Sequence, residues 1–181
     1  MSITRAIRAS DCPDVVWKNG GGTTREIASF PPGAAMDDFL WRFSMAKVDS
    51  QVHSRLSLAS IRRWRCSKGA WPCAAPTLPS RSTTGPSPSP SDGGPSVHDE
   101  PLGRPVRDLN AMVRRGTYGS MMAVAGDRAP CQGTGIIIAL QAQDLGNICL
   151  EAMDCAQIDA PLLLQGPAIC VDFTPDTFAN Q

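Results

Sequence analysis

Two stretches near the N-terminus decide the fold: WKNGGGTTREIA at residues 17–28 and DFLWRFSMA at residues 38–46. Both contain β-branched and aromatic residues that alternate with polar ones, which is typical of half-buried strands. With their flanking residues they predict three strands, at 15–18, 23–29 and 39–48. Pro31, Pro32 and Gly33 separate the last two of these strands. We therefore expect this part of the chain to form a β-sheet.

Three consecutive glycines, Gly20, Gly21 and Gly22, lie between the first two predicted strands. Their backbone N–H groups could line an anion site, but neither a P-loop lysine nor a strand-glycine-helix pattern follows them. A flexible hairpin connection is the favoured interpretation. A turn that faces a ligand is the alternative.

Side chains alternate between the two faces of a strand, which divides each predicted strand into two sets. In 39–48 the larger apolar side chains share one face, a candidate for the core: Phe39, Trp41, Phe43 and Met45. Arg42 lies on the opposite and more polar face. In the preceding strand Thr23 and Arg25 share one face, and Thr24 and Glu26 share the other.

A later stretch, Val106–Arg114, also alternates with a period of two. One face is apolar apart from Arg107. The other face carries an acid, an amide and a base: Asp108, Asn110 and Arg114. That polar set fits either a solvated sheet surface or the mouth of a barrel where polar groups converge on a ligand.

Further strands are predicted towards the C-terminus, separated by glycine, asparagine or aspartate turns, at 135–141, 148–153, 161–164 and 168–173. Short strands at this spacing predict an all-β barrel or jelly roll. A chain of 181 residues suits one compact domain, or two small half-domains that share a core.

Composition excludes several classes of function. Lys plus Arg equals Asp plus Glu, 17 against 17, so no bulk charge favours nucleic acid or anionic membranes. The longest apolar run, residues 135–140, is too short to span a membrane, and no apolar block resembles a secretory signal. We expect a cytoplasmic protein with neither nucleic-acid nor membrane partners.

Cysteine and histidine usage predicts neither disulfides nor a metal. The seven cysteines are odd in number and lack Cys-x-x-Cys spacing, so we expect reduced thiols. His53 and His98 are the only histidines and stand far apart in the sequence. A histidine-based metal site would need ligands that come together, such as a His-x-His pair with a further carboxylate and histidine. We therefore expect no metal and no cofactor.

The composition changes abruptly between residues 52 and 91. These forty residues contain six basic side chains, nine serines and six prolines, and no aspartate or glutamate. Prolines and the lack of alternation disfavour central strands, so an irregular basic loop is expected. Trp64 and Trp71 beside arginines also allow single-stranded nucleic-acid binding, which we consider the weaker interpretation.

A different explanation concerns the coding sequence. Residues 64–69, WRCSKG, can be encoded so that the frame one base earlier reads LAVLEG, and residues 86–91 can similarly become alternating phenylalanine and alanine. The third bases are free choices, so this shows compatibility, and the genomic DNA decides it. A frameshift at about 52–91 would remove strand partners from the barrel and expose sheet edges. We then expect weakened stability and proteolysis first within this segment.

The motifs at 17–28 and 38–46, with a second block at 103–115, resemble the HutD/Ves family. The resemblance implies a cupin-like double-stranded β-helix with two related halves. We accordingly expect a single cupin-like domain over residues 1–181, with an N-terminal half at 1–115 and a C-terminal half at 116–181.

HutD-like proteins are associated with bacterial histidine utilisation, so the resemblance implies a non-enzymatic protein that senses or restrains that pathway. Its partner would be a small carboxylated intermediate, such as urocanate or a formylated glutamate. Carboxylates are bound by Arg, Lys and amide donors. The candidate ligand-binding residues are Lys18, Asn19, Thr23, Arg25, Arg42, Asn110 and Arg114, with Glu26 and Asp108 holding the arginines in place.

Two alternatives stay open. One is a metal-independent isomerase or hydrolase with Glu26 or Asp108 as general base, although the residues contain no serine elbow, cofactor loop or paired cysteine and histidine. The other is a decayed copy without function. Self-association as a homodimer is also open.

Overall fold

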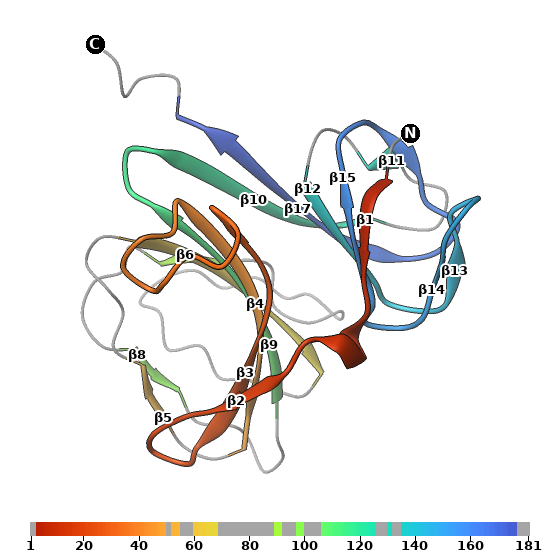
Figure 1. The fold of residues 1–181 in the computed structure, drawn as a ribbon. Helices are drawn as coiled ribbons and strands as arrows, with labels where there is room; N and C mark the ends of the chain where they lie inside the picture. Colours follow the sequence, from red (N-terminus) through yellow and green to blue (C-terminus); the bar gives the residue numbers. More distant parts are fainter. Residues whose placement is uncertain are drawn as a thin grey trace. The chain divides into compact units, whose positions relative to one another are not determined.

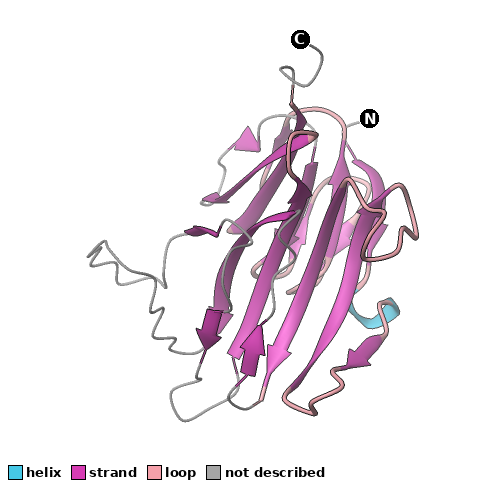
Figure 2. Ribbon diagram, turned by 90° about the vertical axis from the view of Figure 1, so that its left-hand side faces the viewer, coloured by secondary structure: helices cyan, strands magenta, loops and turns pink. Residues whose placement is uncertain are grey.

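The computed structural model describes residues 3–49, 52–54, 60–68, 89–91, 97–99, 106–125, 130–131 and 135–176. Figure 2 shows that these residues form strands joined by loops, with one short 3-10 helix, η1 (Ala9–Asp11). All strand pairs are antiparallel, which confirms the all-β prediction. Within the described ranges no helix is long and apolar enough to cross a membrane. The chain divides into two compact units, one of Asp14–Thr117 and one of Met1–Pro13 with Tyr118–Gln181.

The unit Asp14–Thr117 contains a six-stranded sheet in the order β2-β3-β4-β9-β6-β7 (Figure 1). Its strands are β2 (Asp14–Val16), β3 (Gly22–Phe30), β4 (Trp41–Val48), β9 (Val106–Arg114), β6 (Ser60–Lys68) and β7 (Ser89–Ser91). β5 (Val52–Ser54) and β8 (Val97–Asp99) form a separate two-stranded sheet.

The segment 52–91 contains strands at three places where we expected irregular structure. β6 pairs with β9 from Ser60 to Lys68, and its nine residues include no proline, so none of them lacks the N–H that a ladder needs. Pro90 lies in β7 at the edge of the sheet, where a missing N–H is tolerated. The expectation is therefore wrong for these strands, and the remainder of the segment lies outside the described residues.

The apolar face of this sheet is the predicted one. Phe43 and Met45 on β4 are paired with Ala111 and Leu109 on β9, and all four side chains are buried. At the end of the same face the Phe30 and Trp41 rings stack with centroids 6.1 Å apart. Burying one Phe or Leu side chain stabilises a fold by about 1.5–3 kcal/mol, so this face contributes strongly to stability.

The triple glycine forms the predicted hairpin connection between β2 and β3. Trp17 N donates to Gly22 O at 3.0 Å and Gly20 N donates to Trp17 O at 2.9 Å. Gly20 has a φ of 68°, which glycine adopts without strain. A Cβ at Gly22 would lie 2.2 Å from Lys47 O, so only glycine lets β4 approach this closely.

The second unit contains a five-stranded sheet in the order β1-β15-β12-β17-β10. Its strands are β1 (Ile3–Ile7), β15 (Cys155–Ile158), β12 (Gly135–Ala139), β17 (Ala168–Pro175) and β10 (Tyr118–Ala125). Two further pairs complete it: β11 (Pro130–Cys131) with β16 (Leu162–Leu163), and β13 (Gln143–Asp144) with β14 (Cys149–Leu150). Its buried core cluster includes Ile137, Leu150, Ile158 and Leu164.

The N-terminal strand belongs to this C-terminal unit. β1 lies beside β15 in Figure 1, and Ile3 and Ile158 are register partners. We expected residues 1–13 to belong to an N-terminal half of 1–115, and the observed boundary differs because backbone pairing joins the two ends of the chain. That both halves form a single domain stays a prediction.

A buried carboxylate fastens the N-terminal segment to this unit. Asp154, with a side chain 7% exposed, accepts hydrogen bonds from Arg8 Nη1 at 2.7 Å, Ala9 N at 2.9 Å and Glu151 N at 3.1 Å. Burial raises the pKa of Asp154, but the hydrogen bonds from Ala9, Arg8 and Glu151 and the charge of Arg8 outweigh burial and lower that pKa below its usual value. The carboxylate is therefore a stabilising acceptor in its ionised form.

Candidate ligand-binding site

Strand register brings a set of polar side chains onto one face of the sheet in the unit Asp14–Thr117. Glu26 on β3 is the register partner of Ser44 on β4, and Ser44 is the partner of Asn110 on β9. We call the surface formed by Glu26, Arg42, Ser44, Asp108 and Asn110 the polar face. It lies opposite the apolar face, as strand alternation predicts.

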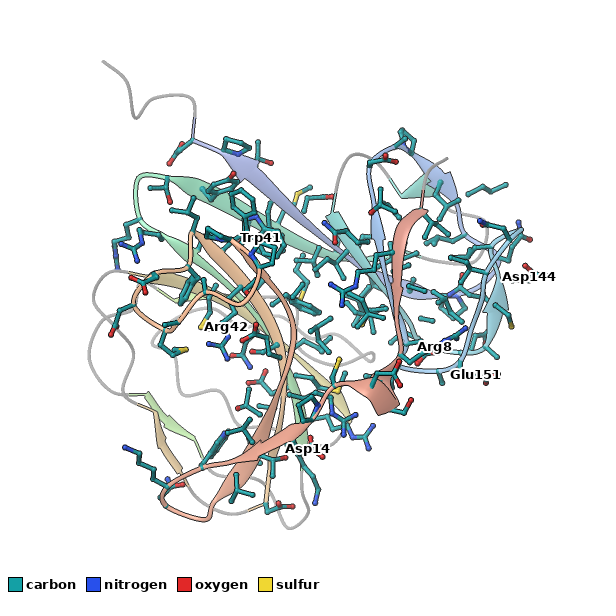
Figure 3. All side chains as sticks on the ribbon, in the orientation of Figure 1. Arg8, Asp14, Trp41, Arg42, Asp144 and Glu151 are labelled. Atoms are coloured by element: carbon teal, nitrogen blue, oxygen red, sulfur yellow. The ribbon has the colours of Figure 1, made fainter. Side chains whose placement is uncertain are left out.

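An ion pair holds Arg42 in place on the polar face. Arg42 Nη2 lies 2.8 Å from Glu26 Oε2, with side chains 15% and 35% exposed. Ser29 Oγ donates to the other Glu26 oxygen at 2.9 Å and accepts from Gly33 N at 3.2 Å. Arg42 Nη1 also contacts Met36 Sδ. Figure 3 shows the Arg42 side chain leaving β4 on the side opposite Trp41. The guanidinium is thus fixed before any ligand arrives.

The centre of the polar face is buried. Ser44, Asn110 and Asp108 are 2%, 5% and 9% exposed. Asn110 Nδ2 donates to Asp108 Oδ2 at 3.1 Å, which orients the amide with its oxygen pointing away from Asp108.

Two buried polar atoms of this face have no hydrogen-bond partner among the described residues: the donor Arg42 Nε and the acceptor Asn110 Oδ1. Buried polar groups are nearly always paired, and leaving one unpaired costs about 1–3 kcal/mol. An unused donor and an unused acceptor on one buried face are what a ligand with both functions would satisfy.

The structure brings four of the nine predicted site residues together, namely Glu26, Arg42, Asp108 and Asn110. Thr23 and Arg25 lie on the opposite face, where Arg25 binds Asp14 through two hydrogen bonds of 3.1 and 2.9 Å. They point away from the polar face because neighbouring residues of a strand face opposite ways.

The remaining three predicted residues lie in turns or at a strand end. Lys18 and Asn19 are exposed in the hairpin connection, and Asn19 Oδ1 accepts a hydrogen bond from Gly21 N at 3.1 Å. Arg114 is the last residue of β9, and it donates to the carbonyl oxygens of Phe39 and Asp37. Arg114 therefore anchors the backbone that leads into β4.

Sequence reasoning missed Ser44, Ser29 and Trp17. Ser44 lies two residues from Arg42 on the same strand, so alternation already placed it on the polar face. Ser29 follows the β-bulge at Glu26/Ala28, which sequence does not reveal. Trp17 Nε1 donates to Thr24 Oγ1 at 2.7 Å and closes the β2–β3 end of this face.

The two histidines, which are distant in sequence, lie on paired strands of the fold. His53 on β5 and His98 on β8 are backbone register partners, because antiparallel pairing joins segments that are distant in sequence. In the described part of the chain no three His, Cys, Asp or Glu side chains gather as metal ligands.

The antiparallel sheets define an all-β protein with a cupin-like fold, and part of its sequence is similar to known proteins. The HutD family model matches residues 9–63. A protein of Pseudomonas putida described as an uncharacterized 21.2 kDa protein in the hutC 3′ region is 45% identical over 49 residues, which are 27% of this chain and 25% of that protein. Protein Ves of Citrobacter koseri is 53% identical over 36 residues, 20% of this chain and 18% of that protein. Each of these matches covers part of the chain, and over that part the chain is similar to HutD and Ves proteins.

The sequence matches span a quarter or less of these curated relatives. The family-model match ends at residue 63, inside the segment 52–91, and the second motif at 103–115 lies beyond it. Solved structures match over nearly the whole chain. HutD from Pseudomonas fluorescens SBW25 superposes with a TM-score of 0.80 at 21% identity, covering 94% of this chain and 98% of that one. A conserved protein of unknown function from Pseudomonas aeruginosa PAO1 gives a TM-score of 0.74 at 23% identity, covering 96% and 98%. These structures confirm the cupin-like fold.

Proposed function

We propose that this chain is a non-enzymatic small-molecule-binding protein of the HutD type, which binds a carboxylated metabolite on the polar face and thereby senses or restrains histidine catabolism. The observation that carries the proposal is the fixed Arg42 guanidinium, whose buried Nε has no partner among the described residues, on the same face as the unused Asn110 Oδ1. Its physiological link rests on the HutD and hutC-region names of the similar proteins.

The chemistry of these groups favours a ligand with two functions. A guanidinium has five N–H donors, and the contacts with Glu26 and Met36 occupy only part of them. A carboxylate is the natural acceptor for the remaining donors. Asn110 Oδ1 needs a donor, which the ring N–H of an imidazole or an amide N–H would provide. Urocanate carries an imidazole N–H together with a carboxylate, and a formylated glutamate carries an amide N–H together with its carboxylates.

A binding role fits Glu26 better than a role as general base. Both of its carboxylate oxygens are engaged, one by Arg42 at 2.8 Å and the other by Ser29 at 2.9 Å. A general base must instead reach the proton it removes from a substrate. We therefore assign Glu26 to positioning Arg42.

Calorimetric titration of the full chain with urocanate and with N-formyl-glutamate tests the proposal, with NMR spectra of the same samples to detect turnover. We expect saturable binding of one of them without product. Arg42→Ala should weaken binding by about thirtyfold or more, the effect of truncating one partner of a buried charged contact. Arg25→Ala removes the same charge from the opposite face of the sheet and should leave the affinity unchanged.

Product formation would favour a metal-independent enzyme and overturn the non-enzymatic role. Equal affinity of the wild type and Arg42→Ala, with circular dichroism showing both folded, would overturn the assigned site. Arg42→Lys is the second variant, because it keeps the charge opposite Glu26 and loses only the planar donor geometry.

A further inference from the structure

A small cavity lies on the face of the sheet opposite the polar face. Its volume is about 70 Å³, and its lining includes Asp14, Thr23, Arg25, Lys47 and Arg107. These residues come from four neighbouring strands, β2, β3, β4 and β9, all within the unit Asp14–Thr117. Three of the lining side chains are cations, and Asp14 is the single carboxylate among them.

Strand register places two of these cations directly opposite each other. Lys47 on β4 pairs with Arg107 on β9, and on its other side Lys47 pairs with Thr23 on β3. Like charges at directly opposed positions of an antiparallel pair destabilise a sheet. An anion bound between them would turn this repulsion into attraction, so the arrangement is suited to a negatively charged ligand.

Two of these cations, Arg25 and Lys47, contact carboxylates that are partly exposed to solvent. Arg25 binds Asp14 at 2.9 Å, with side chains 26% and 50% exposed, and Lys47 binds Asp49 at 2.8 Å, with side chains 52% and 39% exposed. Ion pairs this exposed contribute about 0–1 kcal/mol each, so solvent or a bound anion can compete with them. An ammonium has three N–H donors, and the contact with Asp49 uses one.

From this placement we propose that the cavity is an oxyanion site separate from the polar face, and that it takes a single phosphate group. A cavity of about 70 Å³ is far smaller than the roughly 300–1,000 Å³ of pockets that enclose a whole small-molecule ligand, so it takes one head group rather than a whole metabolite. Three cations and the Thr23 hydroxyl match a divalent tetrahedral oxyanion better than a monovalent carboxylate. The phosphate can be inorganic phosphate or the end of a phosphorylated small molecule.

This site does not depend on the proposed function. The sheet itself separates the two sets of side chains, because Arg25 and Glu26 are consecutive residues of β3 that face opposite ways. A chain that fails to bind a carboxylate at Arg42 can still bind phosphate at Lys47 and Arg107, and the reverse is equally possible.

Isothermal titration of the full chain with inorganic phosphate, at an ionic strength held constant with sodium chloride, tests the site. We expect saturable binding of one phosphate per chain. Arg107→Gln and Lys47→Gln should each weaken it about tenfold. Arg5→Gln removes one exposed positive charge from the other unit and should leave phosphate affinity unchanged.

Parallel titrations identify the ligand class and guard against unfolded variants. Acetate should bind at least tenfold more weakly than phosphate. If glycerol phosphate binds more tightly than inorganic phosphate, the site is assigned to phosphorylated metabolites. Phosphate should raise the melting temperature of the wild type and of Arg5→Gln, but raise that of Arg107→Gln less. The proposal is overturned if phosphate gives no saturable isotherm, if acetate binds as tightly, or if Arg5→Gln weakens binding as much as Arg107→Gln.

Discussion

Replacing Asp154 by alanine should remove the contact that fastens the N-terminal segment to its unit. The substitution leaves the N–H groups of Ala9 and Glu151 without their acceptor. Hydrogen bonds to a charged acceptor contribute about 1.5–3 kcal/mol each, and these two are part-buried, so each is taken at the lower end of that range. The Arg8 contact adds little, because 42% of its side chain is exposed and solvent screens its charge. We therefore expect a loss of about 3 kcal/mol, or about 6–12 °C in melting temperature for a chain of this size.

The pH dependence of this loss has a defined sign. Because the pKa of folded Asp154 is lowered, its ionised form contributes stability that is fully present above the unfolded value of about 3.9. That contribution disappears as the pH falls through the lowered folded pKa. The difference in unfolding free energy between wild type and Asp154→Ala should thus be largest at pH 7 and narrow below about pH 4.

Urea denaturation followed by circular dichroism at pH 7, 5, 4 and 3 measures this difference. Asp159→Ala, which removes an exposed carboxylate from the same unit, is the matched control and should change stability by less than about 0.5 kcal/mol. A difference between wild type and Asp154→Ala that stays constant from pH 7 to pH 3 would refute the role given to the ionised carboxylate.

Three further perturbations follow from local contacts. Burial, with smaller effects from neighbouring groups, raises the pKa of the Cys155 thiol to about 12. At pH 8 iodoacetamide should therefore label the exposed Cys149 of the native chain and leave Cys155 unlabelled, as measured by mass spectrometry. Equal labelling of the two cysteines would contradict the burial of Cys155. Gly22→Ala should destabilise the fold by about 1–3 kcal/mol in urea denaturation, because its Cβ would lie 2.2 Å from Lys47 O. An unchanged denaturation midpoint would show that β4 can move away without loss of stability. Arg114→Lys should lower the free energy of unfolding by about 1 kcal/mol and speed amide hydrogen exchange in residues 37–39, because one ammonium cannot make both carbonyl contacts. Unaltered exchange would contradict the role of Arg114 in holding this backbone.

Strong alternation made parts of the fold predictable from sequence. The strand Val106–Arg114 was predicted with the bounds it has in the structure, because every second residue from Leu109 to Val113 is apolar and the polar residues Asp108, Asn110 and Arg114 share the opposite parity. The same rule placed Phe43 on the core face and Arg42 on the polar face. Where one face of a strand is buried, the period-2 pattern of apolar residues predicts which side chains pack in the core.

Long-range pairing was not predictable in the same way. The partnership of Ile3 with Ile158 joins the two ends of the chain, and nothing in either local sequence indicates it. Neither β10, which contains a glycine and lacks clear alternation, nor β15, at only four residues, was predicted from sequence. β6 was missed because its arginines and serines are poor indicators of a strand, whereas its pairing with β9 depends on the backbone.

The candidate site shows the same division. Alternation already separated Arg25 from Glu26, but shared chemistry led us to group both arginines in one site. The structure places Arg25 beside Asp14 and Arg42 beside Glu26, on opposite faces. Side-chain chemistry indicates candidate anion-binding residues, and strand parity decides which of them share a face.

The claim that the polar face binds a carboxylated ligand is tested most directly by NMR of the side-chain N–H groups during titration with urocanate and with N-formyl-glutamate. We expect the Arg42 Nε–H and Asn110 Nδ2–H signals to move together and to saturate at the same ligand concentration, while the Arg25 Nε–H signal stays in place. Signals of Arg42 and Asn110 that do not move, or a shift confined to Arg25, would contradict it.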